Sequence, residues 1–309
     1  MFEDEKLRDE PRSNITYPNL LDYVYTRNLD ETYDVVHSWR KIMDNFVEKH
    51  HTNEKPLLIE AHFPLQKSME YFNVGGEPFN FDFVHMLNET SIAVHFKQSI
   101  ENWLKALPNG EGSSTPWVIG NHKFRRVASR FGKDGNRADQ ITMLAMVLPG
   151  MAVVYNGDEI GMVDTPLTYE RTLDPQGCNA GREAWLPVNG NYRNLNLASQ
   201  KLVDTSHYKV FKALSSLKKS PVLQKRSVQV SLASDNVPAV IRRLEDPEII
   251  ISLINFNEAT INVNARSNIK IPEILKVHTA SVNSGIVIGS LINTTSLVMP
   301  GAASVVLTQ

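Results

Sequence analysis

Two polar clusters follow directly on short apolar runs, and both contain residue types that can transfer protons or bind a polar ligand. In the first, Leu57–Ile59 are followed at once by Glu60. In the second, Trp117–Ile119 are followed by Gly120 and then by a polar cluster that begins at Asn121. Parallel α/β proteins place their binding and catalytic residues at the carboxyl ends of buried strands. Both positions are therefore candidates for chemistry.

Glu60 has the properties of a general acid. Its neighbours Leu58, Ile59 and Phe63 are apolar, and apolar surroundings raise the pKa of a carboxyl group towards the range that suits proton donation. The alternative is a glutamate at a strand end that pairs with a lysine or stays solvated. The residue alone leaves both interpretations open.

The second cluster contains Asn121, His122 and Lys123, followed by the arginines Arg125, Arg126 and Arg130, and it holds no carboxylate. The histidine could bond a substrate hydroxyl or be structural, and the arginines could bind an anion or solvate the start of a helix. No HExxH metal motif, phosphate-binding glycine loop or G-x-S-x-G nucleophile motif occurs in the sequence.

The elements that must position these clusters alternate between strand and helix. Apolar residues recur at helical spacing in four segments, and short apolar runs indicate strands between them. This alternation favours a parallel sheet built from βα units. The predicted strands lie within 55–63, 78–83, 116–121 and 151–159, and the predicted helices within 30–51, 91–107, 137–148 and 206–219.

After Pro221 the pattern changes to short apolar runs separated by Gly, Pro, Asn and Asp, which is typical of antiparallel strands. We therefore expect a βα domain over 1–222 and a small all-β domain, a β-sandwich, over 223–309. Four parallel strands leave two unpaired edges. The βα domain is expected to be an open sheet or part of something larger.

The composition is that of a globular protein. Of 309 residues 42% are hydrophobic and 21% charged, and the formal net charge is −2, which gives no electrostatic reason to expect nucleic acid as a partner. No apolar stretch is long enough for a transmembrane helix, and the charged N-terminal segment does not resemble a signal peptide. The single cysteine excludes an internal disulfide and a cysteine-based metal site. Glycosylation sequons occur at Asn14, Asn88 and Asn293.

Several motifs together resemble a known family. In order, they are "FEDEKLRDEPR", "LLIEAHF", "PFNFDF", "WVIGNHKFRRVASRFG", "GMAVVYNGDEIGM", "WLPVN" and "YRNLNLASQK". This series is similar to the second half of α-glucosidases (maltases) of the α-amylase superfamily, particularly those of insects. The resemblance runs from residue 2 to about residue 220, and it implies the second half of a TIM (β/α)8 barrel.

The resemblance also implies a chemistry. Family members hydrolyse α-glucosides such as maltose or sucrose with retention. For this chain we expect neither a cofactor nor a metal. They use an aspartate nucleophile and a glutamate acid/base about 5–5.5 Å apart, with a third acid from an Asn-His-Asp motif. By this resemblance Glu60 occupies the acid/base position. Asn121 and His122 correspond to the first two residues of the Asn-His-Asp motif, and Arg126 corresponds to the arginine that follows it. Asn121, His122 and Arg126 are therefore expected to bind the substrate.

The sequence departs from the family at three places. Lys123 stands where the third acid is expected, the Gly-x-Arg-x-Asp pattern of the nucleophile strand is absent from 1–309, and the segment 179–185 is short. An ammonium group would repel the positive charge that develops in the transition state by roughly 4 kcal/mol at ~4 Å and an effective dielectric of 20. These departures predict a chain without α-glucosidase activity.

Three interpretations remain open at this point. The chain could be a glycoside hydrolase of α-glucosides, as its resemblance suggests. It could be a non-catalytic relative that binds sugar or acts as a scaffold for a partner, although it lacks the membrane helix of the transporter heavy subunits in this superfamily. It could also be a truncated copy or an incomplete gene model, which would not account for Lys123. Relatives are secreted or membrane-anchored, and the cellular location of this chain stays open.

Overall fold

The computed structural model describes residues 6, 8–11, 23–26, 29–61, 64–108, 115–132, 137–166, 189–225, 227–244 and 248–309. The chain divides into two compact units. Unit 1 comprises Met1–Phe79 and Ala106–Gly110, and unit 2 comprises Asn80–Lys105 and Glu111–Gln309. Each unit is built from its own secondary structure and is described in turn below.

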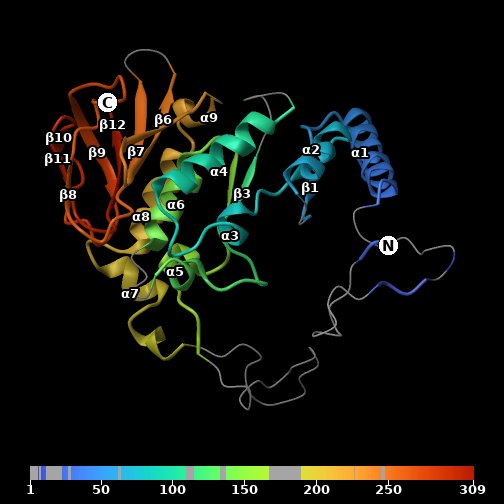
Figure 1. Cartoon of the computed structure of the whole chain (residues 1–309), viewed down its shortest axis with the longest axis horizontal. Coiled ribbons are helices and arrows are strands. Elements are labelled where there is room, and N and C mark those ends of the chain that lie inside the picture. The colour runs from blue at the N-terminus through green and yellow to red at the C-terminus, as the bar shows by residue number, and fades with distance from the viewer. Residues whose placement is uncertain are drawn as a thin grey trace. The chain divides into compact units, whose positions relative to one another are not determined.

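Unit 1 is a βαβ unit preceded by a long helix (Figure 1). The helix α1 (Glu31–His50) confirms the helix predicted over 30–51, with acidic residues in its first turn and basic residues in its last, as the helix dipole favours. The strands β1 (Leu58–Ile59) and β2 (Glu77–Pro78) pair in parallel and are joined through α2 (Leu65–Asn73). Their small core consists of Val36, Ile59 and Tyr71.

The strand predicted over 78–83 was wrong over its second half. Unit 2 opens with Asn80, which makes a single parallel bridge to Trp117, and the chain then turns into α3 (Asp82–His85). The side-chain Oδ1 of Asn80 accepts a hydrogen bond from the amide of Asp82 at 2.8 Å, and such asparagine turns compete with extended backbone. Phe83 is buried because it stacks on Trp117, not because a strand alternates there.

A second parallel pair carries the Asn121 cluster. The strands β3 (Pro116–Val118) and β4 (Met151–Val153) pair with Pro116 opposite Met151. The chain between them forms α5 (Val127–Arg130) and α6 (Arg137–Val147), and α4 (Ala93–Ala106) precedes β3. These parallel pairs and their helices confirm the alternation that the sequence predicted. Within the described residues no helix is long and apolar enough to cross a membrane.

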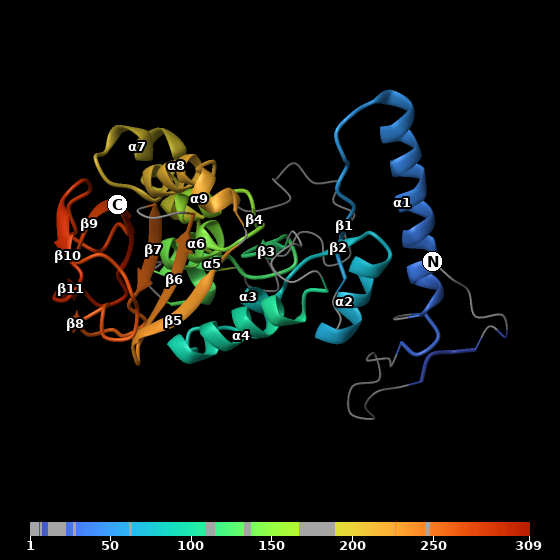
Figure 2. The same ribbon diagram turned by 90° about the horizontal axis from the view of Figure 1, so that it is seen from above.

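The helix α6 is buried on all sides, since every residue from Arg137 to Val147 is enclosed. It packs against α8 (His207–Leu217) and against the C-terminal strands β6 (Val237–Arg243), β7 (Ile249–Ile254) and β12 (Ser304–Thr308). These elements lie together in both ribbon views (Figure 2). Polar side chains cross this contact, since Gln140 Nε2 donates to the Asn255 carbonyl at 3.0 Å. The short helices η2 (Asp158–Ile160), η4 (Gly190–Arg193), α7 (Leu197–Leu202) and α9 (Pro221–Gln224) complete this part.

The C-terminal strands are antiparallel, as predicted after Pro221. Six of them form one sheet in the order β10-β9-β12-β7-β6-β5, and β11 pairs with β8. Both sheets contribute to one hydrophobic core. The strands are β5 (Gln229–Ser234), β6 (Val237–Arg243), β7 (Ile249–Ile254), β8 (Ile261–Val263), β9 (Ile274–Ala280), β10 (Leu291–Asn293), β11 (Leu297–Met299) and β12 (Ser304–Thr308). A domain boundary at residue 222 stays a prediction, because the helices and the sheet belong to one compact unit.

A pair of a buried aspartate and a half-buried histidine ties these layers together. The carboxylate of Asp139 on α6 bonds His207 Nδ1 on α8 at 2.7 Å through one oxygen, and its other oxygen accepts the Val282 amide at 2.9 Å. Burial alone would lower the pKa of His207, but the hydrogen bond and charge of Asp139 outweigh it and raise that pKa. The pair fixes α8 and the turn after β9 against α6.

Candidate active site

Glu60 immediately follows β1 in unit 1, at the carboxyl end of the strand as predicted. Its side chain is exposed, as is Leu58, whereas Ile59 is buried in the core of the unit. The described residues therefore do not enclose the carboxyl group in apolar surroundings. His62 and Phe63, two and three residues after Glu60, lie outside the described residues.

In unit 2 a tight turn at the carboxyl end of β3 presents the second cluster. Asn121 Oδ1 accepts a hydrogen bond from the amide of Lys123 at 2.9 Å. This bond closes the turn, and the side chains of His122 and Lys123 are exposed. An imidazole and an ammonium group are thus displayed side by side at the end of a buried parallel strand.

A buried carboxylate lies behind this turn. It is not among the site residues predicted from the sequence. Asp158 follows β4, and its side chain is fully enclosed. A Cβ placed on Gly120 would lie 2.5 Å from Asp158 Oδ2, so only a glycine lets the β3 turn approach this carboxylate. The signal in the sequence was the acidic segment after the fourth apolar run, together with a glycine directly after the third.

Arginines surround Asp158. Arg126 Nη1 lies 3.7 Å from Asp158 Oδ1 and donates to the Asn156 carbonyl at 2.6 Å. The amide of Arg126 also donates to Asp164 Oδ1 at 2.7 Å. Arg130 donates to the Ile119 carbonyl at 2.7 Å, and burial lowers its pKa to about 10. Arg126 therefore joins the loops after β3 and β4, and its expected contact with a substrate stays a prediction.

The electrostatics of Asp158 are set by its burial. Desolvation raises the pKa of this carboxyl group to about 6, although the Tyr155 amide, Arg126 and Arg130 all act in the opposite direction. A carboxyl group that titrates near pH 6 is therefore held directly beneath Gly120.

This burial makes a prediction about stability. The folded pKa lies above the ordinary value, so the parent chain should lose stability as the pH rises from about 4 to about 6, when the buried group must ionise. The variant Asp158→Asn has no such group to ionise. The difference in the free energy of unfolding, variant minus parent, should therefore increase by up to about 3 kcal/mol between pH 4 and pH 7. Urea unfolding at a series of pH values measures the difference, with Asp204→Asn as an exposed control. A difference that stays constant with pH would contradict this account.

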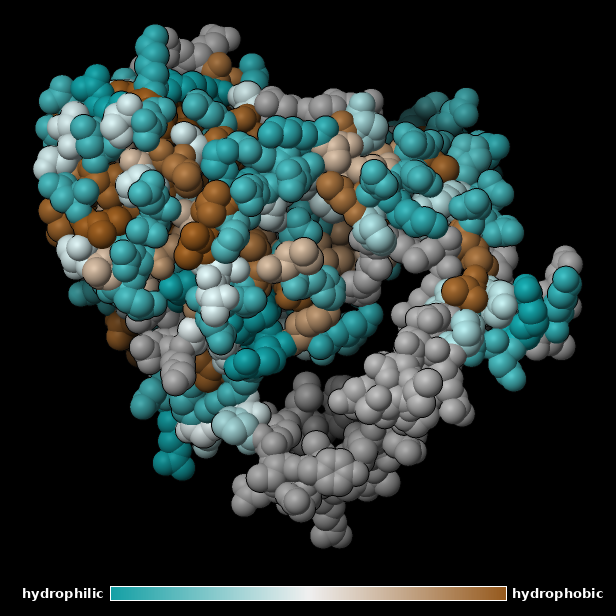
Figure 3. Space-filling view, in the orientation of Figure 1, coloured by the Kyte–Doolittle hydropathy of each residue, from teal (hydrophilic) through white to brown (hydrophobic). Residues whose placement is uncertain are grey.

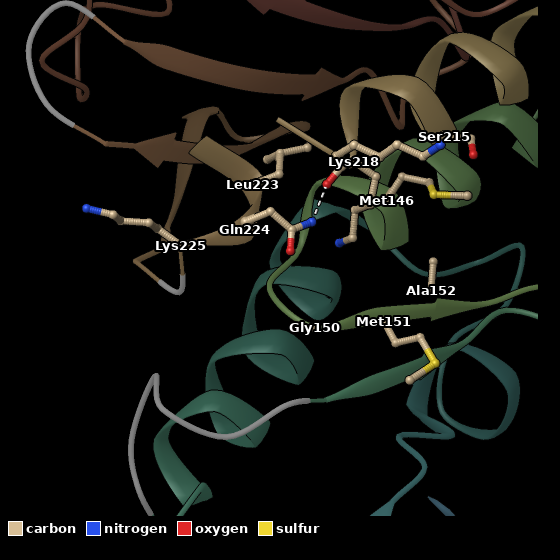
Figure 4. Close-up of a pocket in the computed structure, with 10 residues that line it drawn as sticks. Met146, Gly150, Met151, Ala152, Ser215, Lys218, Leu223, Gln224 and Lys225 are labelled. Carbon is tan, nitrogen blue, oxygen red and sulfur yellow. Dashed lines mark hydrogen bonds between the residues drawn. The ribbon is translucent and has the colours of Figure 1, made fainter. Parts of the chain in front are cut away.

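A cavity of about 500 Å³ lies at the opposite end of β4 (Figure 4). Met146, Met151 and Ala152 line it together with residues of α8, α9 and the turn between them. Lys218 Nζ donates to the Leu148 carbonyl there at 2.6 Å, and burial lowers its pKa to about 7. Because this cavity is at the amino end of the strand, it is separate from the turn at Asn121.

Comparison with known proteins places the chain in a family. Residues 2–184 match the family model of the α-amylase catalytic domain. The chain belongs to the α-amylase catalytic-domain family. It is 35% identical over 319 residues to an α-glucosidase from Apis mellifera, covering 92% of this chain and 54% of that protein. It is likewise 35% identical over 324 residues to maltase 1 from Drosophila virilis, covering 92% and 51%.

The fold agrees with this membership in the α-amylase family. A trehalulose synthase from Pseudomonas mesoacidophila superposes with a TM-score of 0.65 at 16% identity, over 91% of this chain and 61% of that one. The resemblance to insect maltases that the motifs suggested is thereby confirmed. The chain spans about half the length of the curated relatives it matches.

Within this α-amylase relative the predicted site residues fall in different parts. Asn121, His122, Lys123 and Arg126 share unit 2, whereas Glu60 belongs to unit 1. The short segment 179–185 and the opening motif before residue 6 lie outside the described residues. In the described part of the chain no group of three or more His, Cys, Asp and Glu side chains could hold a metal ion.

Proposed function

We propose that this member of the α-amylase family binds α-glucosides such as maltose or sucrose without hydrolysing them. The proposal depends on one observation: the residue displayed after Asn121 and His122 is Lys123, held in a closed turn by the Asn121 side chain. By the family resemblance, this position belongs to the acid that supports the transition state. This replacement is internal to the chain, and an ammonium group there opposes the positive charge that develops during cleavage.

The chemistry of the turn supports binding. A neutral histidine donates through one ring nitrogen and accepts through the other, and an asparagine amide both donates and accepts. Such groups suit sugar hydroxyls. Lys123 can donate three hydrogen bonds, but its charge opposes the positive charge that develops at the anomeric carbon during cleavage. The same turn can therefore stabilise a bound sugar while disfavouring its hydrolysis.

Two structural features complete the proposal. We infer that the parallel pairs β1–β2 and β3–β4 belong to a partial (β/α)8 barrel covering residues 1–222. The C-terminal sheets would then form a β-sandwich over 223–309.

Isothermal titration of the full chain with maltose, sucrose and glucose tests the binding. Maltose or sucrose should give a saturable signal, and the double variant Asn121→Ala, His122→Ala should weaken binding at least tenfold. His37→Ala, at an exposed histidine of α1, is the matched control and should leave it unchanged. If neither disaccharide gives a signal, the sugar-binding proposal is wrong.

A further inference from the structure

The six-stranded sheet of unit 2 has an open edge at β10. This strand pairs with β9 alone among the described strands and forms one end of the sheet order, as Figure 1 shows. The backbone groups on its other side have no strand partner there. An exposed edge of this kind is a template for pairing with another chain, and proteins normally protect it.

The outward face of this edge carries two exposed apolar side chains beside two polar ones. In the β9–β10 ladder Asn293 lies opposite Ile274, and Leu291 lies opposite Lys276. Paired residues and those two positions away share one face of a sheet, so these four side chains stand together. Ile274 is 48% exposed and Leu291 is 71% exposed. We refer to Ile274 and Leu291 as the edge patch.

The turn before β10 extends the apolar surface, since Val287 and Ile288 are 69% and 55% exposed. In the space-filling view hydrophobic residues are visible over this end of the sheet (Figure 3). The only charge on the face of the edge patch within the β9–β10 ladder is Lys276. Exposed apolar side chains beside an unpaired strand edge favour pairing with another chain unless something covers them.

Asn293 begins a sequon, Asn293-Thr294-Thr295, on that same face. Its side chain is exposed, and Oδ1 accepts hydrogen bonds from the Thr295 amide at 2.8 Å and the Thr295 hydroxyl at 2.7 Å. The Nδ2 atom donates a long hydrogen bond, 3.4 Å, to Glu273 Oε1. Asn-x-Thr is the acceptor sequence for N-glycosylation, so both the sequence and the exposure of this amide suit attachment of a sugar chain.

A second sequon has the same local geometry and serves as a comparison. Asn88, between α3 and α4, is exposed, and its Oδ1 accepts bonds from the Thr90 amide at 2.9 Å and the Thr90 hydroxyl at 2.7 Å. The third sequon, at Asn14, lies outside the described residues.

We propose that Asn293 carries an N-linked glycan and that this glycan covers the edge patch. In the modification a bond forms between Asn293 Nδ2 and the anomeric carbon of an oligosaccharide, and the bond from that carbon to a lipid pyrophosphate breaks. The amide loses a proton, and the lipid pyrophosphate leaves. A bulky hydrated group at Asn293 lies directly across from Ile274 and two residues from Leu291. It therefore shields the apolar side chains and blocks a strand from pairing along β10.

Expression of the full chain behind a cleavable leader in a eukaryotic secretory host tests the modification. Treatment with an N-glycan-releasing amidase should increase the electrophoretic mobility of the secreted protein. The peptide containing Asn293 should be recovered with aspartate at that position. Without amidase treatment, Asn293→Gln and Thr295→Ala should each show an electrophoretic mobility increased by the amount that loss of one glycan causes. If Asn293 is recovered unmodified from the secreted protein, the proposal is wrong.

The covering role has its own test. Light scattering at 37 °C should rise several-fold faster for Asn293→Gln than for the glycosylated parent, and Leu291→Thr combined with Asn293→Gln should restore the parental rate. Asn88→Gln is the matched control, since it removes an exposed sequon of the same geometry and should not accelerate aggregation. Equal aggregation of Asn293→Gln and Asn88→Gln would overturn the covering role. Neither test involves Glu60 or the Asn121 turn, so both are independent of the sugar-binding proposal.

Discussion

An active relative whose motif reads Asn-His-Asp should lose most of its activity when a lysine replaces that aspartate. In a water-shielded cleft, loss of one charge at ~4 Å removes roughly 4 kcal/mol of stabilisation at an effective dielectric of 20, which is about three powers of ten in rate. Asparagine at that position should therefore lower kcat/KM by about three powers of ten, and lysine should lower it further because it adds repulsion.

Steady-state hydrolysis of a chromogenic α-glucoside by the two variants of the relative measures the effect. The informative quantity is the difference between lysine and asparagine, because both remove the carboxylate and only lysine brings a positive charge. If both variants were equally slow, the charge of Lys123 would have no part in the loss of activity.

The second large effect concerns Trp117, which supports the turn from below. Its side chain is fully buried, stacks on Phe83 at 5.6 Å between ring centroids, and donates from Nε1 to the Pro149 carbonyl at 2.7 Å. Trp117→Ala should cost about 3–5 kcal/mol of stability, because the cavity left in a parallel sheet cannot collapse fully. Trp117→Phe should cost less, since it keeps most of the packing and loses the hydrogen bond.

Thermal unfolding followed by circular dichroism tests this prediction for unit 2. The matched control is Trp39→Ala, because Trp39 on α1 is 50% exposed and exposed substitutions usually stay within about 0.5 kcal/mol. If Trp117→Ala lowered the stability no more than Trp39→Ala does, the prediction that β3 depends on Trp117 would be wrong.

The sequence predicted the elements that have strong local signals. The helix α6 was found because its apolar residues are dense and no Gly or Pro interrupts them, although its complete burial depends on contacts with β6, β7 and β12. The antiparallel strands predicted after Pro221 are also confirmed. The segment 78–83 was assigned wrongly because alternating Phe residues resemble a strand, whereas the Asn80 side chain begins a turn there.

For the site, the sequence located side chains but not their environments. Glu60 and the Asn121 turn follow their strands as predicted, because strand ends are set by local apolar runs. The exposure of Glu60 and the burial of Asp158 depend on tertiary packing, and no local sequence pattern encodes that packing. Asp158 could have been suspected only by asking which acid needs the space left by a missing Cβ at Gly120.

The central claim is that Lys123 leaves this α-amylase relative able to bind sugar and unable to cleave it. Hydrolysis of a chromogenic α-glucoside by the purified chain tests this claim most directly. The expected result is a rate equal to that of buffer, for the parent chain and for Glu60→Gln alike, under conditions in which maltose or sucrose binds. Turnover by the parent chain that disappears in Glu60→Gln would contradict the claim.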